Sequence, residues 1–206
     1  MVDTERLSSK AEKQEAAIRF LHAAYDVGNL DIYLNGQVNL SNFAYKTAVG
    51  FFRIPSGTYQ IAVYPAGEKE KSLVSKRLQI KHLSLSYTIA IAGKADCMEI
   101  LSFENSVDVP IGEAKIRFLH LAFDTSALDI AVKARDVVFP KLHFAAATYY
   151  LGITPMTVDL EARATGGKEI VLPLPKMKFL ADHAYSIALT GSARRLPNLE
   201  AIVLID

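Results

Sequence analysis

The same sequence unit occurs twice in this chain of 206 residues. Residues 18–33, IRFLHAAYDVGNLDIY, return as residues 116–131, IRFLHLAFDTSALDIA, with ten of the sixteen positions identical at an offset of 98. The offset of 98 also relates 86–93, SYTIAIAG, to 184–191, AYSIALTG. A repeat at a fixed period indicates a tandem duplication, here of a unit of about 95 residues, which is the size of a small β-sandwich.

Each copy has the pattern of a series of short β-strands. Within residues 17–22, Ile18, Phe20 and His22 alternate onto one face, as in a strand with one buried face. Asn35-Gly36, after residues 30–34, is the strongest short signal for a hairpin. Further strands are expected near 38–45, 48–54, 58–64, 72–80, 85–92 and 98–104. Short strands spaced by turn residues predict an all-β fold of two tandem antiparallel β-sandwiches.

These patterns divide the chain into four parts. A polar N-terminal segment (1–15) is expected to be helical or frayed, copy one spans 16–105, a linker spans 106–112, and copy two spans 113–206. The linker carries Pro110 and Gly112 and is too short for free tumbling, so we expect the two copies to touch. In copy two, Lys133-Ala134 replace the Asn-Gly pair, so this hairpin turn is expected to be longer or of another type.

The overall composition argues against several classes of protein. Lys and Arg total 23, Asp and Glu total 22, and the net charge is +1, which disfavours a protein that binds nucleic acid or an anionic membrane. No apolar run approaches the roughly 18 residues of a spanning helix, so no membrane insertion is expected. The N-terminus lacks the apolar core of a signal peptide. The chain is therefore predicted to be cytoplasmic as written, with a spore coat or cell surface as alternative locations.

No sequence motif with a known catalytic mechanism is present. The chain lacks GxGxxG, GxxxxGK[ST], HExxH and GxSxG, and its single cysteine excludes a Cys-rich zinc site. We therefore predict that the protein is not an enzyme, has no catalytic residues, and needs neither a cofactor nor a metal.

Polar residues that the duplication kept in both copies are the candidates for a binding site. They are His22, Asp26 and Asp31 in copy one and His120, Asp124 and Asp129 in copy two. One interpretation is a ligand or Ca²⁺ site, because two nearby carboxylates can share a cation. The alternative is structural, with the histidine held by a neighbouring backbone group or carboxylate and the first Asp capping a turn. In that alternative the second Asp is exposed and pairs with Arg19 or Arg117.

Two adjacent aromatic pairs are candidates for an interface. Phe51-Phe52 and Tyr149-Tyr150 lie in expected strands, where successive side chains point to opposite faces. One member of each pair therefore faces away from the core, which predicts contact with the other copy or with a partner.

The repeated opening, followed by IPSGTYQIAVYPAG and YTIAIAG, resembles the bacterial "domain of unknown function 4397" family. Copy two lacks the hairpin glycine and the P-x-G motif before the following strand. The resemblance implies an immunoglobulin- or transthyretin-like sandwich at the cell surface, with no established activity. The residues that fall on the family pattern are His22, Asp26, Asp31, Asn35, Gly36, Gly57, Tyr59 and Tyr87, and in copy two His120, Asp124, Asp129 and Tyr185.

Two functions remain open at this stage. The first is a non-catalytic structural or adhesive protein that assembles with itself or with a protein partner. The second is a binding module for a glycan, a peptide or Ca²⁺, through the loops that carry Asp26 and Asp124. Concentration-dependent assembly would favour the first, and ligand-dependent stabilisation would favour the second.

Overall fold

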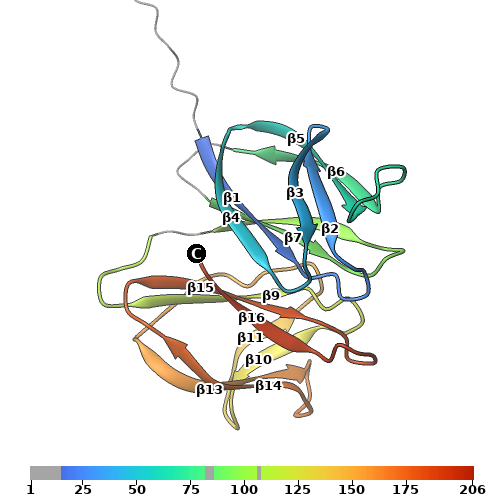
Figure 1. Cartoon of the computed structure of the whole chain (residues 1–206). Helices are drawn as coiled ribbons and strands as arrows, with labels where there is room; N and C mark the ends of the chain where they lie inside the picture. The colour runs from blue at the N-terminus through green and yellow to red at the C-terminus, as the bar shows by residue number, and fades with distance from the viewer. Residues whose placement is uncertain (1–14, 82–85, 106–107) are drawn as a thin grey trace, which may run out of the picture.

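The computed structural model describes residues 15–81, 86–105 and 108–206, and all regular structure in these ranges is β-strand. Figure 1 shows the strands of copy one in blue to green above those of copy two in yellow to red. Each copy consists of two four-stranded sheets. The all-β prediction is therefore confirmed. The described residues contain no helix of the length and hydropathy needed to cross a membrane.

Copy one contributes β1 to β8. The sheet nearer to copy two has the order β4-β1-β7-β8, and the outer sheet has the order β3-β2-β5-β6. The strands are β1 (Glu15–His22), β2 (Leu30–Leu34), β3 (Gln37–Phe43), β4 (Ala48–Pro55), β5 (Gly57–Pro65), β6 (Val74–Ile80), β7 (Ser86–Ala92) and β8 (Glu99–Asn105). The strands expected from the sequence thus agree with those observed to within about two residues, which is the usual error for element boundaries.

Copy two repeats this topology with β9 to β16. Its inner sheet has the order β12-β9-β15-β16, and its outer sheet has the order β11-β10-β13-β14. The strands are β9 (Ala114–His120), β10 (Leu128–Val132), β11 (Val137–Leu142), β12 (Leu151–Ile153), β13 (Met156–Ala164), β14 (Ile170–Phe179), β15 (His183–Thr190) and β16 (Glu200–Ile205). The main difference is β12, which has 3 residues where β4 has 8.

The prediction of purely antiparallel sheets is wrong for one strand pair in each copy. β1 pairs with β7 in parallel, and β9 pairs with β15 in parallel. A parallel pair needs a long crossover, and here the intervening strands supply it. The immunoglobulin type is not confirmed, because the first two strands of an immunoglobulin domain share a sheet, whereas β1 and β2 lie in different sheets. The transthyretin-like type stays a prediction.

The expected N-terminal helix is not confirmed. Glu15 and Ala16 already belong to β1, and residues 1–14 of that segment lie outside the described residues. Ser106 and Val107 of the expected linker also lie outside them, and the four-part division of the chain stays a prediction.

The two hairpin turns follow the sequence signals. Asn35 and Gly36 both have positive φ, 48° and 80°, as a two-residue type I′ turn requires. In copy two, residues 133–136 separate β10 from β11, so this turn is longer, as expected. Ala134 takes the positive φ there, 55°.

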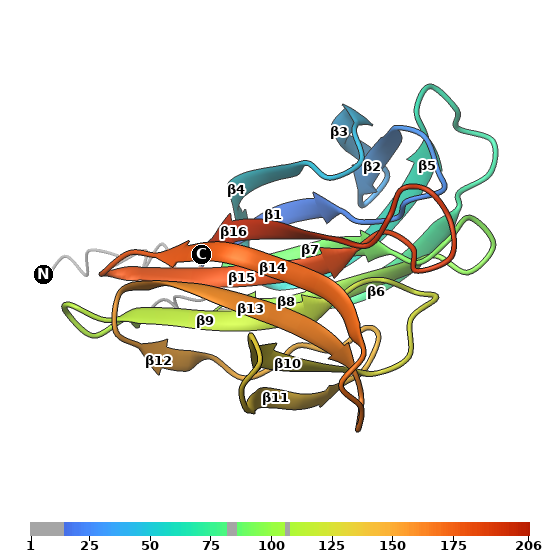
Figure 2. The same cartoon turned by 90° about the horizontal axis from the view of Figure 1, so that it is seen from below.

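Three apolar clusters account for the buried core. One fills the sandwich of copy one, around Phe20 and Ile89, and a second fills the sandwich of copy two, around Phe118 and Ile187. The third lies between the inner sheets of the two copies and contains Leu21, Ala23, Ala90, Ala92, Leu101, Phe103, Leu119, Leu121, Ala188 and Leu204. In Figure 1, β15 and β9 of copy two lie on the side that faces copy one, and β13 and β14 lie on the far side. In Figure 2, the view from below, β16 of copy two runs close to β1 of copy one. The expected contact between the copies is therefore confirmed.

Candidate functional site

The duplicated histidines lie at the ends of β1 and β9 and are fully buried. Nε2 of His22 lies 3.1 Å from the carbonyl oxygen of Gly28, and Nε2 of His120 lies 3.2 Å from that of Ser126. A carbonyl can only accept, so Nε2 carries the proton in both rings. Each ring thereby links its strand to the loop that follows. Burial lowers the pKa of both histidines, with the carbonyl contact opposing this effect.

The loop carboxylates bind backbone amides of a distant loop. Oδ1 of Asp26 accepts from the amide of Ala95 at 3.0 Å, and Oδ1 of Asp124 accepts from the amide of Ala193 at 3.1 Å. The predicted kind of contact is correct, but the partner is not the local turn. Each Asp instead joins the loop after the first strand of its copy to the loop between the last two strands.

Asp31 and Asp129 are buried, so the prediction of an exposed Asp paired with Arg19 or Arg117 is wrong. Asp31 accepts from the amides of Asn42 and Gly67 at 2.8 and 3.0 Å. Asp129 accepts from those of Lys141 and Gly166 at 2.7 and 3.0 Å. Burial alone would raise the pKa of Asp129, but these amide donors lower it overall. Each carboxylate fixes a neighbouring bulge and turn to the outer sheet.

The contacts of all six residues are structural, although Asp31 and Asp129 are buried and bind backbone amides rather than an arginine. The buried rings and the amide-bound carboxylates hold loops together, and within the described ranges no three His, Cys, Asp or Glu side chains converge in a way that could hold a metal ion. Their role in ligand or Ca²⁺ binding stays a prediction that no contact in the structure favours.

The buried histidines make the stability of the protein depend on pH. A histidine in the unfolded chain has a pKa of about 6.5, and the folded values are lower. Below about pH 6.5 the unfolded state therefore binds more protons, and the free energy of unfolding falls by up to about 1.4 kcal/mol per pH unit for each histidine. Urea unfolding between about pH 7 and pH 5 should show this loss, and His22→Gln should reduce its slope. A stability that is flat or rises on acidification would contradict the expectation.

Arg19 of β1 reaches from copy one into copy two. Its guanidinium forms an ion pair with Asp206 and donates to the carbonyl oxygen of Ile205 at 2.7 Å. Its Nε donates to Oγ1 of Thr88 in its own sheet at 2.9 Å. Asp206 also accepts from the hydroxyls of Tyr150 and Ser186. The end of β16 is thus fixed against β1.

Arg117 of β9 makes the reciprocal contacts. It donates to the carbonyl oxygen of Glu104 at 2.6 Å and to Oδ1 of Asn105 at 2.5 Å, and its Nε donates to Oγ of Ser186 at 2.8 Å. The sheet registers show that Glu104 in copy one corresponds to Ile205 in copy two. In each copy, the arginine of the first strand therefore binds the end of the other copy's last strand, so that the two sets of contacts are related by an approximate two-fold axis.

The aromatic pairs divide between the core and this junction. Phe52 packs against the core of copy one, whereas the ring of Phe51 lies 5.0 Å below the guanidinium of Arg19. The ring of Tyr150 lies 4.5 Å from the guanidinium of Arg117, and burial raises the pKa of its hydroxyl. Tyr149 is 67% exposed, and its ring packs edge-on against that of Phe139. An interface role for these four residues with another molecule stays a prediction.

Sequence reasoning missed the two arginines as the centre of the junction. Their signal was present, because Arg19 and Arg117 stand at the same offset of 98 as the histidines. A further signal was the apolar character of Leu21 and Leu119 on the strand face that does not point into the sandwich.

The fold and these contacts define a class, namely a duplicated β-sandwich protein whose two copies share one buried junction. The family model described as "Domain of unknown function (DUF4397)" matches residues 16–131, more than half of the chain. The chain belongs to this family, which confirms the resemblance seen in the sequence. The match covers copy one and continues through the repeated opening segment of copy two. A comparison with curated proteins gives no match.

The chain also has distant similarities to solved structures. One is a family CBM26 module of Eubacterium rectale Amy13K in complex with maltoheptaose, at 11% identity and a TM-score of 0.26, covering 93% of this chain and 97% of the other. Another is a fimbrial assembly protein from Parabacteroides distasonis, at 11% identity and a TM-score of 0.26, covering 93% and 98%. At such TM-scores these similarities carry no argument about fold or function.

Proposed function

We propose that this chain is a non-catalytic structural or adhesive protein that holds two β-sandwiches in a fixed arrangement. The proposed partners are a protein or further copies of the chain, and the proposed setting is a cell surface or spore coat. The observation that carries the proposal is the junction, where an apolar cluster and two reciprocal arginine contacts join the inner sheets.

The polar side chains kept in both copies support this function. His22, Asp26, Asp31 and their counterparts bind loops of their own copy, and Arg19 and Arg117 bind the opposite copy. These contacts fix the loops within each copy and the position of one copy against the other, as a structural protein requires. A fixed pair of sandwiches presents its surfaces in a constant geometry, which lowers the entropic cost of assembly.

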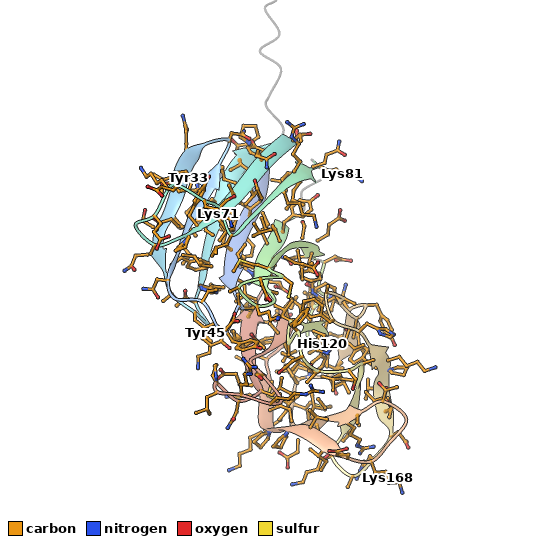
Figure 3. The ribbon with its side chains drawn as sticks, turned by 90° about the vertical axis from the view of Figure 1, so that its right-hand side faces the viewer. Tyr33, Tyr45, Lys71, Lys81, His120 and Lys168 are labelled. Atoms are coloured by element: carbon orange, nitrogen blue, oxygen red, sulfur yellow. The ribbon has the colours of Figure 1, made fainter. Side chains whose placement is uncertain are left out.

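The exposed aromatic ring of Tyr149 provides the test. Analytical ultracentrifugation of the purified protein over a wide concentration range should show a weight-average mass that rises with concentration. Tyr149→Ser should weaken this assembly, because a large exposed aromatic side chain is typical of interface centres. Tyr33→Ser, in the outer sheet of copy one (Figure 3), is the matched control. A protein that stays monomeric throughout and adheres to no bacterial surface would contradict the proposal.

A further inference from the structure

A hollow of about 570 Å³ opens on the outer sheet of copy two. It lies between the β10–β11 turn and the β13–β14 turn. Figure 3 shows Lys168, on its rim, at the end of the molecule that lies farthest from Tyr33. The lining residues are Lys133, Ala134, Arg135, Asp136, Glu161, Arg163, Lys168 and Ile170.

The hollow arises from differences between the two copies at equivalent positions. In copy one Tyr33 and Tyr64 cover this part of the outer sheet, with their ring centroids 5.1 Å apart. By strand register Tyr33 corresponds to Ala131, and Tyr64 corresponds to Arg163. Copy two therefore loses two phenol rings from this face and gains a longer hairpin turn beside it. The duplication kept the junction and the loop contacts but changed this surface.

A buried ion pair fixes one wall of the hollow. Nη2 of Arg163 lies 2.6 Å from Oε1 of Glu161, and the two side chains are 11% and 6% exposed. Arg163 also donates to the carbonyl oxygen of Arg135 at 2.9 Å, and Glu161 accepts from the amide of Ala134 at 3.3 Å. The turn 133–136 is thus held in place over the sheet, which prepares the wall for a ligand.

The charge of the lining is positive. It has four cationic and two anionic side chains, and Glu161 is already paired with Arg163. Lys133 pairs with Asp159 at 3.7 Å. Arg135, Lys168 and Asp136 remain, two cations against one anion. Neither Arg135 nor Lys168 lies within ion-pair distance of a carboxylate in the ranges that the structure covers. Ile170, 52% exposed, adds an apolar side chain to the lining.

We propose that this hollow binds a small organic anion, a sugar-sized ring that carries a phosphate or a carboxylate. Arg135 and Lys168 would bind the oxyanion by charge-assisted hydrogen bonds, which are the stronger class. The volume lies within the range of small-molecule sites and exceeds what a free phosphate fills, so the ring occupies the remainder against Ile170. The proposal does not rest on the proposed structural function, because a monomer can bind such a ligand equally well.

The test is an NMR titration of the full-length ¹⁵N-labelled protein with glucose 6-phosphate, glucuronate, inorganic phosphate and glucose. Glucose 6-phosphate or glucuronate should shift amide signals around 133–136 and 166–170 with a Kd of about 1 mM or tighter. Inorganic phosphate should bind at least about tenfold more weakly, and glucose should not bind. Inorganic phosphate binding as tightly as the sugar phosphate would overturn the role of the ring. Glucose binding equally well would overturn the role of the charge, and no shift with either anion would overturn the site.

Variants separate this hollow from general attraction of anions. Arg135→Ala and Lys168→Ala should each weaken glucose 6-phosphate binding by about tenfold. Both side chains are exposed, so the folded spectrum should be retained. Lys69→Ala is the matched control, because Lys69 lies in the corresponding β5–β6 connection of copy one, over the ring of Tyr33. Equal loss of binding in Lys69→Ala, or no loss in the copy-two variants, would overturn the proposal.

Discussion

Replacing Arg19 with alanine is expected to lower the free energy of unfolding by about 3–5 kcal/mol, since it leaves the partner of a buried ion pair without its counter-charge. The Asp206 side chain is fully buried, and that of Arg19 is 6% exposed. The substitution also removes donors to Ile205 and Thr88. Urea unfolding followed by circular dichroism would measure the change.

A double-mutant cycle distinguishes the ion pair from packing. Asp206→Asn gives copy two the neutral amide that copy one already has at Asn105, where Arg117 binds. In the Asp206→Asn background, Arg19→Ala should therefore cost less than it does alone, with a coupling of about 0.5–3 kcal/mol. Additive effects of the two substitutions would show that Arg19 stabilises the junction by its size rather than by its charge.

Local signals in the sequence were sufficient to locate most strands. The alternation around Phe20 and the Asn35-Gly36 pair act over a few residues, and the observed β1, β2 and β3 follow them. Such signals depend on side-chain period and turn geometry, which the chain determines locally. They do not determine which strands meet. The parallel pairing of β1 with β7 places Arg19 opposite Thr88. These two residues are far apart in the sequence, and no local pattern predicts that they pair.

The candidate site was only partly predictable for the same reason. The duplication correctly indicated that His22, Asp26 and Asp31 matter to each copy. Their partners are backbone groups, some of them far along the chain, as with Asp26 and Ala95, and any residue type can supply such a group. The ion pair of Arg19 spans 187 positions to Asp206 and exists only after both sandwiches have formed and docked.

The hollow on the outer sheet of copy two could not be predicted from the repeat. The repeat identifies residues that the two copies share, whereas the hollow beside Arg163 lies where their residues differ. Its recognition needs the strand registers, because these align Tyr64 with Arg163, which are 99 positions apart rather than 98. Differences between internal repeats become interpretable once structure places them at equivalent positions.

Introducing a carboxylate into the apolar cluster between the copies should have the largest effect of any single substitution considered. Leu119 is fully buried there, beside Leu121 and Ala188. Leu119→Ala is expected to lower the free energy of unfolding by about 2–5 kcal/mol through lost burial and a cavity. Leu119→Asp adds an unpaired buried charge, which costs several kcal/mol more unless the surrounding structure opens.

Leu119→Asp is expected to separate the two copies at their junction. The side chain of Leu119 points between the copies, whereas that of the neighbouring Phe118 points into the core of copy two. Separation of the inner sheets would hydrate the new carboxylate while leaving each sandwich core intact. Small-angle X-ray scattering should then show a larger radius of gyration, and urea unfolding should lose its single cooperative transition. Leu119→Met keeps the volume and is the control, with an expected cost below about 1.5 kcal/mol. Leu119→Asp unfolding like Leu119→Met would mean that the copies do not depend on this apolar contact.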